Sequence, residues 1–194
     1  EIIDSFKVNK DIDLVWKDGE GGYKELVYPI TQEEEGVHIL TLKYNDKVHP
    51  DNTINYTSKT IIMDKTKPVK GEISYSEAAL ETEDALFFRE DATISFMITE
   101  ANFHEEGLVL EDKRYLNRNN GAEDTYTLSD ETEGNKRLNY TLFDDETDTW
   151  IVTYTIPKDE YGTHKVTLKY NDICQNGEII FEPKTIIMDQ APDS

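Results

Sequence analysis

Apolar and polar residues alternate along much of the chain. In residues 162–172, GTHKVTLKYND, threonine and lysine occupy alternate positions. A period of two predicts a β-strand with one buried and one exposed face. The residues expected on the buried face are His164, Val166, Leu168 and Tyr170.

The same alternation recurs in short segments separated by Asn, Asp and Gly. Residues 92–100 place Ile94, Phe96 and Ile98 on one face, and no stretch shows a sustained helical period. Short strands at regular spacing predict an all-β sandwich rather than a parallel sheet. In the second half of the chain the predicted strands are residues 69–76, 85–89, 92–100, 107–115, 124–129, 137–144, 149–157, 162–172 and 179–188.

The chain also contains an internal repeat. Residues 36–46, GVHILTLKYND, recur as residues 162–172, and the sequence KTIIMD occurs twice, ending at Asp64 and at Asp189. The first pair is offset by 126 residues and the second by 125. A nearly constant offset predicts two homologous modules in series.

The two predicted modules differ in length. Residues 65–190 are expected to form a complete module, whereas residues 1–64 form a partial or shortened one, which lacks about 61 residues that would supply the opening strands. Either the segment begins inside a module, or the first copy buries its apolar face in another way. Residues 191–194 are expected to begin a linker or tail.

Net charge limits the partners of the chain. The sequence has 20 Lys and Arg against 41 Asp and Glu, a net charge of −21. The negative electrostatic field of such a charge repels phosphate backbones and anionic lipid head groups, so we expect no nucleic acid partner and no direct membrane insertion. No apolar run approaches the roughly 18 residues of a membrane span. The N-terminus EIIDSFKV does not resemble a signal peptide, so any export signal is expected outside this segment.

Few side chains indicate catalytic chemistry. Cys174 is the only cysteine, which excludes an intrachain disulfide, and we expect a partly buried thiol without a paired base. The sequence shows no carboxylate pair or catalytic triad, so we expect no enzyme. The histidines have no metal-ligand spacing; they are His38, His49, His104 and His164.

Two further clusters have structural interpretations. The acidic run FDDETDTW at 143–150 lacks the glycine and the closing glutamate of a calcium-binding EF-hand loop, and a hairpin turn is predicted instead. Trp150 and Tyr154 share one face of a predicted strand, as in a sugar-stacking platform. Ile156 lies on the same face, which favours packing in the core.

Longer motifs resemble a known family. The segments ISFMITEANFHEEGLVL at 94–110 and IIMDKTKP at 61–68 are similar to the tandem bacterial immunoglobulin-like (Big) domains of Gram-positive surface proteins. The resemblance covers residues 65–190 and the C-terminal half of the module in residues 1–64. The family often carries a tyrosine two residues after the glycine that begins the repeated strand, where this chain has a histidine in both copies.

The resemblance implies immunoglobulin-like β-sandwich modules in tandem. It also implies a non-catalytic structural or adhesive segment of a larger bacterial protein that is extracellular or anchored to the cell wall. The implied partners are neighbouring modules of the same chain and a host or cell-surface protein or glycan. The alternative is a glycan- or protein-binding module appended to a secreted carbohydrate-active enzyme, which should expose aromatic side chains in a groove.

Sandwich topology also predicts a metal site at the junction of the modules. The second strand and the strand before the last should end at the pole where the linker enters. Oxygen atoms from two loops and a linker suit calcium, the one cofactor considered, which would neutralise repelling carboxylates and stiffen the junction. The alternative is ordinary turn chemistry with backbone hydrogen bonds. The candidate ligands are Asp64, Glu100, Asn102, Asn171 and Asp172.

The calcium hypothesis predicts heat in a calorimetric titration and a higher melting temperature in calcium than in chelator, because a ligand of the folded state stabilises it. Extracellular modules bind calcium at roughly 10⁻⁴–10⁻³ M, which sets the concentrations for the titration. A titration without heat, together with an unchanged melting temperature, would contradict the hypothesis.

Overall fold

The computed structural model describes residues 2–4, 15–18, 20–22, 24–31, 34–45, 48–49, 51–117, 123–129 and 137–189. Within these ranges the secondary structure consists of β-strands and two short 3₁₀ segments, which confirms the all-β class. No helix in the described part of the chain is long and apolar enough to cross a membrane. The chain divides into two compact units, Glu1–Lys65 and Thr66–Ser194.

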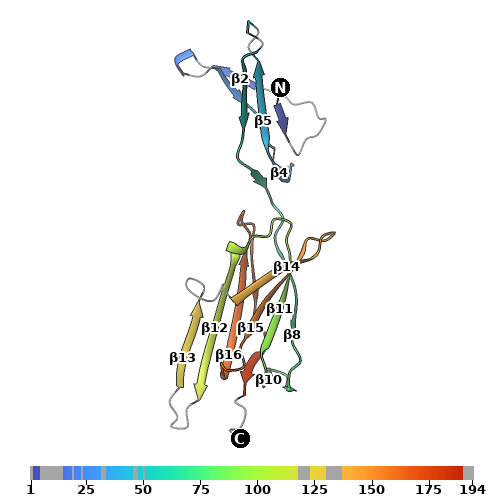
Figure 1. The fold of residues 1–194 in the computed structure, drawn as a ribbon, viewed down its shortest axis with the longest axis vertical. Coiled ribbons are helices and arrows are strands. Elements are labelled where there is room, and N and C mark those ends of the chain that lie inside the picture. The colour runs from blue at the N-terminus through green and yellow to red at the C-terminus, as the bar shows by residue number, and fades with distance from the viewer. Residues whose placement is uncertain are drawn as a thin grey trace. The chain divides into compact units, whose positions relative to one another are not determined.

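Two sheets form the second unit (Figure 1). The smaller sheet has the order β14 (Leu138–Asp144), β15 (Thr149–Ile156), β11 (Ala92–Thr99) and β8 (Val69–Tyr75). The larger sheet has the order β13 (Glu123–Ser129), β12 (Leu108–Asn117), β16 (Gly162–Asn171), β18 (Thr185–Met188), β10 (Ala85–Phe88) and β9 (Leu80–Glu81), and β17 (Glu178–Phe181) also pairs with β16. Strands β10 and β18 are parallel, and the other pairs are antiparallel.

One apolar core lies between the two sheets. Along β11 every second residue is buried, and Ile94, Phe96 and Ile98 are fully buried, as the alternation predicts. Strand β16 contributes Leu168 and Tyr170 to the same core from the larger sheet. Because both sheets supply buried residues to one cluster, burial of their facing sides holds them together.

The strands predicted in the second half are found to within two residues at each end, apart from the last. The prediction of a single strand over 179–188 is wrong, because β17 ends at Phe181 and β18 begins at Thr185. Pro183 lies between them and has no backbone N–H to donate to a strand ladder. The short strand β9 was not predicted.

Three small sheets form the described part of the first unit. One contains β1 (Ile2–Asp4), β5 (Leu40–Asn45) and β6 (Thr53–Thr57), another contains β2 (Val15–Asp18) and β3 (Lys24–Val27), and the third contains β4 (Gly36–His38) and β7 (Ile61–Met63). The repeated strand is therefore divided into β4 and β5 in this copy. Leu42 is half-buried and Tyr44 is 52% exposed, whereas the equivalent Leu168 and Tyr170 are fully buried.

Both copies make the same corner before the repeated strand. The backbone N–H groups of Glu34 and Glu160 each donate to the carbonyl three residues earlier, at 3.1 and 2.9 Å. Gly36 and Gly162 follow two residues later with φ angles of 143° and 131°. Glycine adopts such angles without steric cost, so the repeated glycine has a conformational reason.

The corner predicts a glycine-specific stability effect. A β-carbon at Gly162 would lie 2.7 Å from the carbonyl oxygen of Tyr115, at a positive φ. We expect Gly162→Ala to lower the free energy of unfolding of the second unit by roughly 1–3 kcal/mol, measured by urea denaturation. Gly177→Ala is the matched control, because its β-carbon would meet no atom closer than 3.6 Å. Equal stability of the two variants would contradict the prediction.

Candidate functional site

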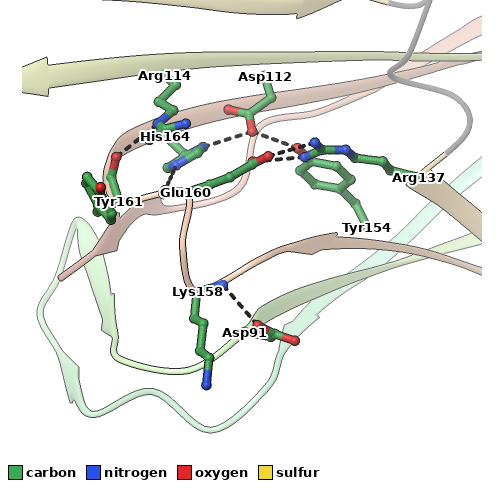
Figure 2. Close-up of polar contacts among 9 residues, drawn as sticks. All are labelled: Asp91, Asp112, Arg114, Arg137, Tyr154, Lys158, Glu160, Tyr161 and His164. Atoms are coloured by element: carbon green, nitrogen blue, oxygen red, sulfur yellow. Dashed lines mark hydrogen bonds and ion pairs between the residues drawn. The ribbon is translucent and has the colours of Figure 1, made fainter. Parts of the chain in front are cut away.

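A buried polar cluster connects the corner of the second unit to both sheets (Figure 2). Asp112 lies on β12 and His164 on β16, both in the larger sheet, while Tyr154 lies on β15 of the smaller sheet. All three residues are 0% exposed. A buried carboxylate is costly unless it is paired and hydrogen-bonded, so the contacts of Asp112 determine whether the core tolerates it.

The hydrogen bonds of Asp112 determine where the protons lie. Its Oδ2 atom accepts the Tyr154 hydroxyl at 2.7 Å and lies 2.9 Å from Nδ1 of His164. The other ring nitrogen, Nε2, is 2.7 Å from the carbonyl oxygen of Glu160 and must donate, because a carbonyl only accepts. The bond between Nδ1 and Oδ2 needs one proton, on the ring or on the carboxyl group. In either case the His164–Asp112 pair carries no net charge.

Tyr154 remains a hydrogen-bond donor throughout the physiological range. Burial, followed by the nearby Asp112 carboxylate, raises the pKa of Tyr154 far above its ordinary value. The remaining oxygen of Asp112, Oδ1, is buried without a hydrogen-bond partner among the described residues. The carboxyl group is therefore fixed through one oxygen, Oδ2, which takes part in both hydrogen bonds.

A second, partly shielded ion pair lies beside this cluster. Arg137, immediately before β14, donates two hydrogen bonds to the Glu160 carboxylate, at 2.8 and 2.7 Å. The Arg137 contact is the main reason why the pKa of Glu160 is lowered from its ordinary value, and the same contact raises the pKa of Arg137. Both groups therefore stay ionised at neutral pH, and the two-bond geometry fixes their orientation.

Two further contacts hold the segment between β15 and β16. Arg114 donates from Nε to the carbonyl oxygen of Tyr161 at 2.9 Å, with its guanidinium over the Tyr161 ring. The backbone N–H of Lys158 donates to Oδ1 of Asp91 at 2.9 Å. Figure 2 shows these contacts on either side of the corner. The segment is thus tied to β12 of the larger sheet and to the residue that precedes β11 of the smaller sheet.

This geometry favours anchoring over proton transfer. Both ring nitrogens of His164 are hydrogen-bonded and the side chain is fully buried, so it has no position for a substrate atom. The carbonyl of Glu160 and the carboxyl of Asp112 occupy its two sites. What the cluster does is connect the corner to the facing sheets.

The first unit repeats part of this arrangement. His38 is fully buried, and its Nε2 lies 2.8 Å from the carbonyl oxygen of Glu34, four residues earlier. His164 makes the same bond to Glu160 at the same spacing. In immunoglobulin-like sandwiches a tyrosine hydroxyl can make such a backbone bond at this corner. Here a histidine ring makes it in both copies.

The predicted calcium ligands of the second unit are mostly engaged in turn contacts. The Asp172 carboxylate accepts the backbone N–H groups of Cys174 at 2.6 Å and Asn176 at 2.8 Å. Oε1 of Glu100 accepts the backbone N–H of Asn102 at 2.9 Å. These are the hydrogen bonds that the turn-chemistry alternative predicts.

The loop between β11 and β12 packs against the end of β16 in the second unit, where the Phe103 and Tyr170 rings stack with their centroids 5.2 Å apart. The loop after β11 packs against Asn171, since a β-carbon at Gly107 would lie 2.2 Å from the Asn171 carbonyl oxygen. The side chain of Asn171 is exposed. Asp64 belongs to the first unit. The five-residue calcium site therefore stays a prediction.

Other sequence predictions have clear outcomes. The acidic run forms a turn in which Asp144 accepts the Glu146 N–H at 2.9 Å and the Thr147 hydroxyl at 2.8 Å, which confirms the hairpin. Tyr154 packs in the core, as predicted. The prediction of a partly buried Cys174 is wrong, because the residue lies in the turn after β16 and is exposed.

Sequence reasoning missed Asp112, Arg137 and Glu160. The first has a visible signal, because Asp112 follows Leu108 and Leu110 at the spacing of one strand face, where an apolar residue is expected. A charged residue on a core face indicates a buried partner. Arg137 has no comparable signal, since it precedes the alternating segment of β14.

Removing the histidine ring should destabilise the second unit. His164→Phe removes the hydrogen bonds of the ring to the buried Asp112 carboxyl and to the Glu160 carbonyl, so we expect a loss of roughly 3–5 kcal/mol in urea denaturation. The additional change Asp112→Leu should restore part of this loss, because it removes the buried carboxyl as well. Lys158→Met, which removes an exposed pair with Glu90, is the control and should cost less than about 1 kcal/mol. A His164→Phe cost no larger than that of the control would contradict the role of the ring.

The Glu160–Arg137 pair predicts a specific pH dependence. Because the pKa of Glu160 is lower in the folded state than the ordinary value of 4.5, its stabilisation is complete at neutral pH and is lost as the pH falls below about 4.5. Glu160→Gln should therefore be less stable than the unmodified chain at neutral pH, with the difference narrowing in acid. Urea denaturation across this range measures it, with Glu90→Gln as an exposed control. A difference that is independent of pH would argue against the pair.

Comparison with known proteins adds no relative. No protein-family model matches the chain, and no curated protein sequence matches it.

Proposed function

We propose that this chain is a non-catalytic structural or adhesive segment of a larger bacterial protein outside the cell, built from immunoglobulin-like sandwich modules in series. Its role is to separate or display other parts of that protein and to bear load along the chain. The repeat supports the serial arrangement, since the same corner and strand occur twice. The extracellular location rests on the resemblance to Big domains.

Strand order in the second unit supports the immunoglobulin-like assignment. In that fold the strands are lettered A to G in chain order. Strands A, B, E and D form one sheet, and strands C, F and G form the other. The smaller sheet contains β8, β11, β15 and β14 in the A-B-E-D order. The larger sheet places β12, β16 and β18 side by side, as C-F-G requires.

The observation that carries the proposed role is the parallel pairing of β10 with β18. Four residue pairs connect these strands, from Ala85 with Thr185 to Phe88 with Met188. Strand β10 lies in the first part of the unit and β18 near its end. A force that separates the two chain ends therefore loads the β10–β18 hydrogen bonds in shear, so that they resist together rather than opening one at a time.

Surface shape favours a structural role over small-molecule binding. The described hollows have volumes of about 180, 240 and 260 Å³. Sites for drug-sized ligands usually span roughly 300–1,000 Å³. A protein-binding role is the second candidate, and one observation favours it: Tyr140, Leu142 and Phe143 of β14 are all more than 40% exposed.

The flanking sequence of the parent gene would distinguish a structural segment from a binding module appended to an enzyme. An export signal, further copies at the same period and a wall anchor would support the structural segment. An adjoining catalytic domain would overturn it in favour of a module appended to a carbohydrate-active enzyme.

Single-molecule force spectroscopy tests the load-bearing role. The second unit, held within the full chain and pulled from both ends, should unfold in one event. Thr185→Pro removes the Thr185 N–H bond to the Asp84 carbonyl, at 3.1 Å, and should lower the unfolding force markedly. Val166→Ala is the control, because it destabilises the core without removing a β10–β18 bond. If both variants lower the force equally at matched stability, shear of these strands does not bear the load.

A further inference from the structure

Strand β14 has an open edge. It is the end strand of the smaller sheet, and among the described residues only β15 pairs with it. In an antiparallel pair, alternate residues of an edge strand direct their N–H and C=O groups away from the partner strand. Such groups can form hydrogen bonds with an added strand from another chain.

The core-facing side of β14 is only partly covered. Tyr140 lies opposite Val152 and Leu142 lies opposite Trp150, so both project from the same side of the sheet as Val152. Val152 is fully buried, yet Tyr140 is 43% exposed and Leu142 is 44% exposed. At this edge the described residues therefore leave apolar surface in contact with solvent.

A hollow of about 260 Å³ adjoins this apolar surface. Leu108 and Leu138 supply apolar walls, and the hydroxyl of Tyr140 donates to the carboxylate of Glu105. Glu105 and Glu106 are exposed carboxylates at the rim. We call these residues the β14 edge surface: Leu138, Tyr140 and Leu142 of β14 with Glu105, Glu106 and Leu108.

The chemistry of the hollow matches a basic side chain. The aliphatic stem of a lysine or arginine packs well against leucines while its charged group stays near the rim. An aromatic ring and carboxylates together attract a cation. The hollow therefore combines apolar walls and negative charge in the arrangement that a long cationic side chain needs.

Charge also restricts what can add to this edge. Residues 138–148 contain four carboxylates and no lysine or arginine. A second copy of the chain would bring its own net charge of −21 to the same place, and like charges repel. Charge complementarity therefore favours a basic partner over self-association.

We propose that the β14 edge surface binds an extended basic segment of a partner protein, which adds a strand to β14 and inserts a lysine or arginine into the hollow. Backbone hydrogen bonds to β14 supply affinity that does not depend on sequence. The hollow and its two glutamates select the basic residue. This binding is independent of the load-bearing role, because it uses the opposite edge of the unit's smaller sheet from β8 and does not involve the β10–β18 pair.

Fluorescence anisotropy with the full chain tests the proposal. The probe is a labelled short peptide of alternating lysine and valine, and we expect saturable binding that weakens with salt. The double variant Glu105→Gln/Glu106→Gln should reduce the affinity roughly three- to tenfold, as the loss of two exposed ion pairs predicts. The matched control is Glu72→Gln/Glu77→Gln, which removes the same charge near β8, at the far edge of that sheet, and should leave the affinity within about twofold.

Four results would overturn the proposal. Absence of binding would do so, as would equal losses in the two double variants, which would indicate general attraction to an acidic protein. Equal affinity for a lysine–valine peptide with alternate backbone nitrogens methylated would exclude strand addition, because that peptide cannot form the ladder. A dimer detected by sedimentation and abolished by Glu105→Gln/Glu106→Gln would assign the surface to a second copy instead.

Discussion

The hydrogen bond from a buried histidine ring to the carbonyl four residues earlier is the contact on which the second unit depends. It fixes the corner between β15 and β16, and thereby the position at which β16 enters the core. The corner also needs Gly162, because its φ is positive and a β-carbon there would lie 2.7 Å from the carbonyl oxygen of Tyr115. One flexible residue and one rigid ring together define where the central strand of the larger sheet begins.

The same ring explains why a core of apolar side chains contains a carboxyl group. The second ring nitrogen of His164 needs a hydrogen-bond partner, and Oδ2 of Asp112 supplies it. The Tyr154 hydroxyl donates to the same oxygen from the facing sheet. Because the His164–Asp112 pair has no net charge, the cost of burial is far smaller than for an isolated ion. The cluster thus adds directional bonds between two sheets whose other contacts are mainly apolar and non-directional.

How much of the fold and of the polar cluster could be predicted from the sequence depends on how far apart the interacting residues lie along the chain. Period-two alternation locates the strands of the second unit because each strand buries one face, and it places Ile94 and Phe96 in the core. It does not locate the break between β17 and β18, where Pro183 lies among the polar residues Glu182, Lys184 and Thr185. Among the predicted calcium ligands, Asp172 and Glu100 make hydrogen bonds to backbone N–H groups two to four residues away, as turn chemistry predicts. The Asp112–His164 contact joins residues 52 positions apart, so the sequence marks Asp112 as a charged residue on a core face but does not identify its partner.

The repeat separates what local sequence determines from what the surrounding fold determines. The Gly-x-His corner forms in both copies with the same backbone bond, because all of its parts lie within a few residues of one another. The strand that follows does not behave alike, since Tyr170 is buried while Tyr44 is 52% exposed. Burial requires a facing sheet, and in the part of the chain that the structure describes, the core that two sheets form together lies in the second unit. The same sequence therefore forms strands in both copies, but it becomes a core strand only where other segments supply the opposing surface.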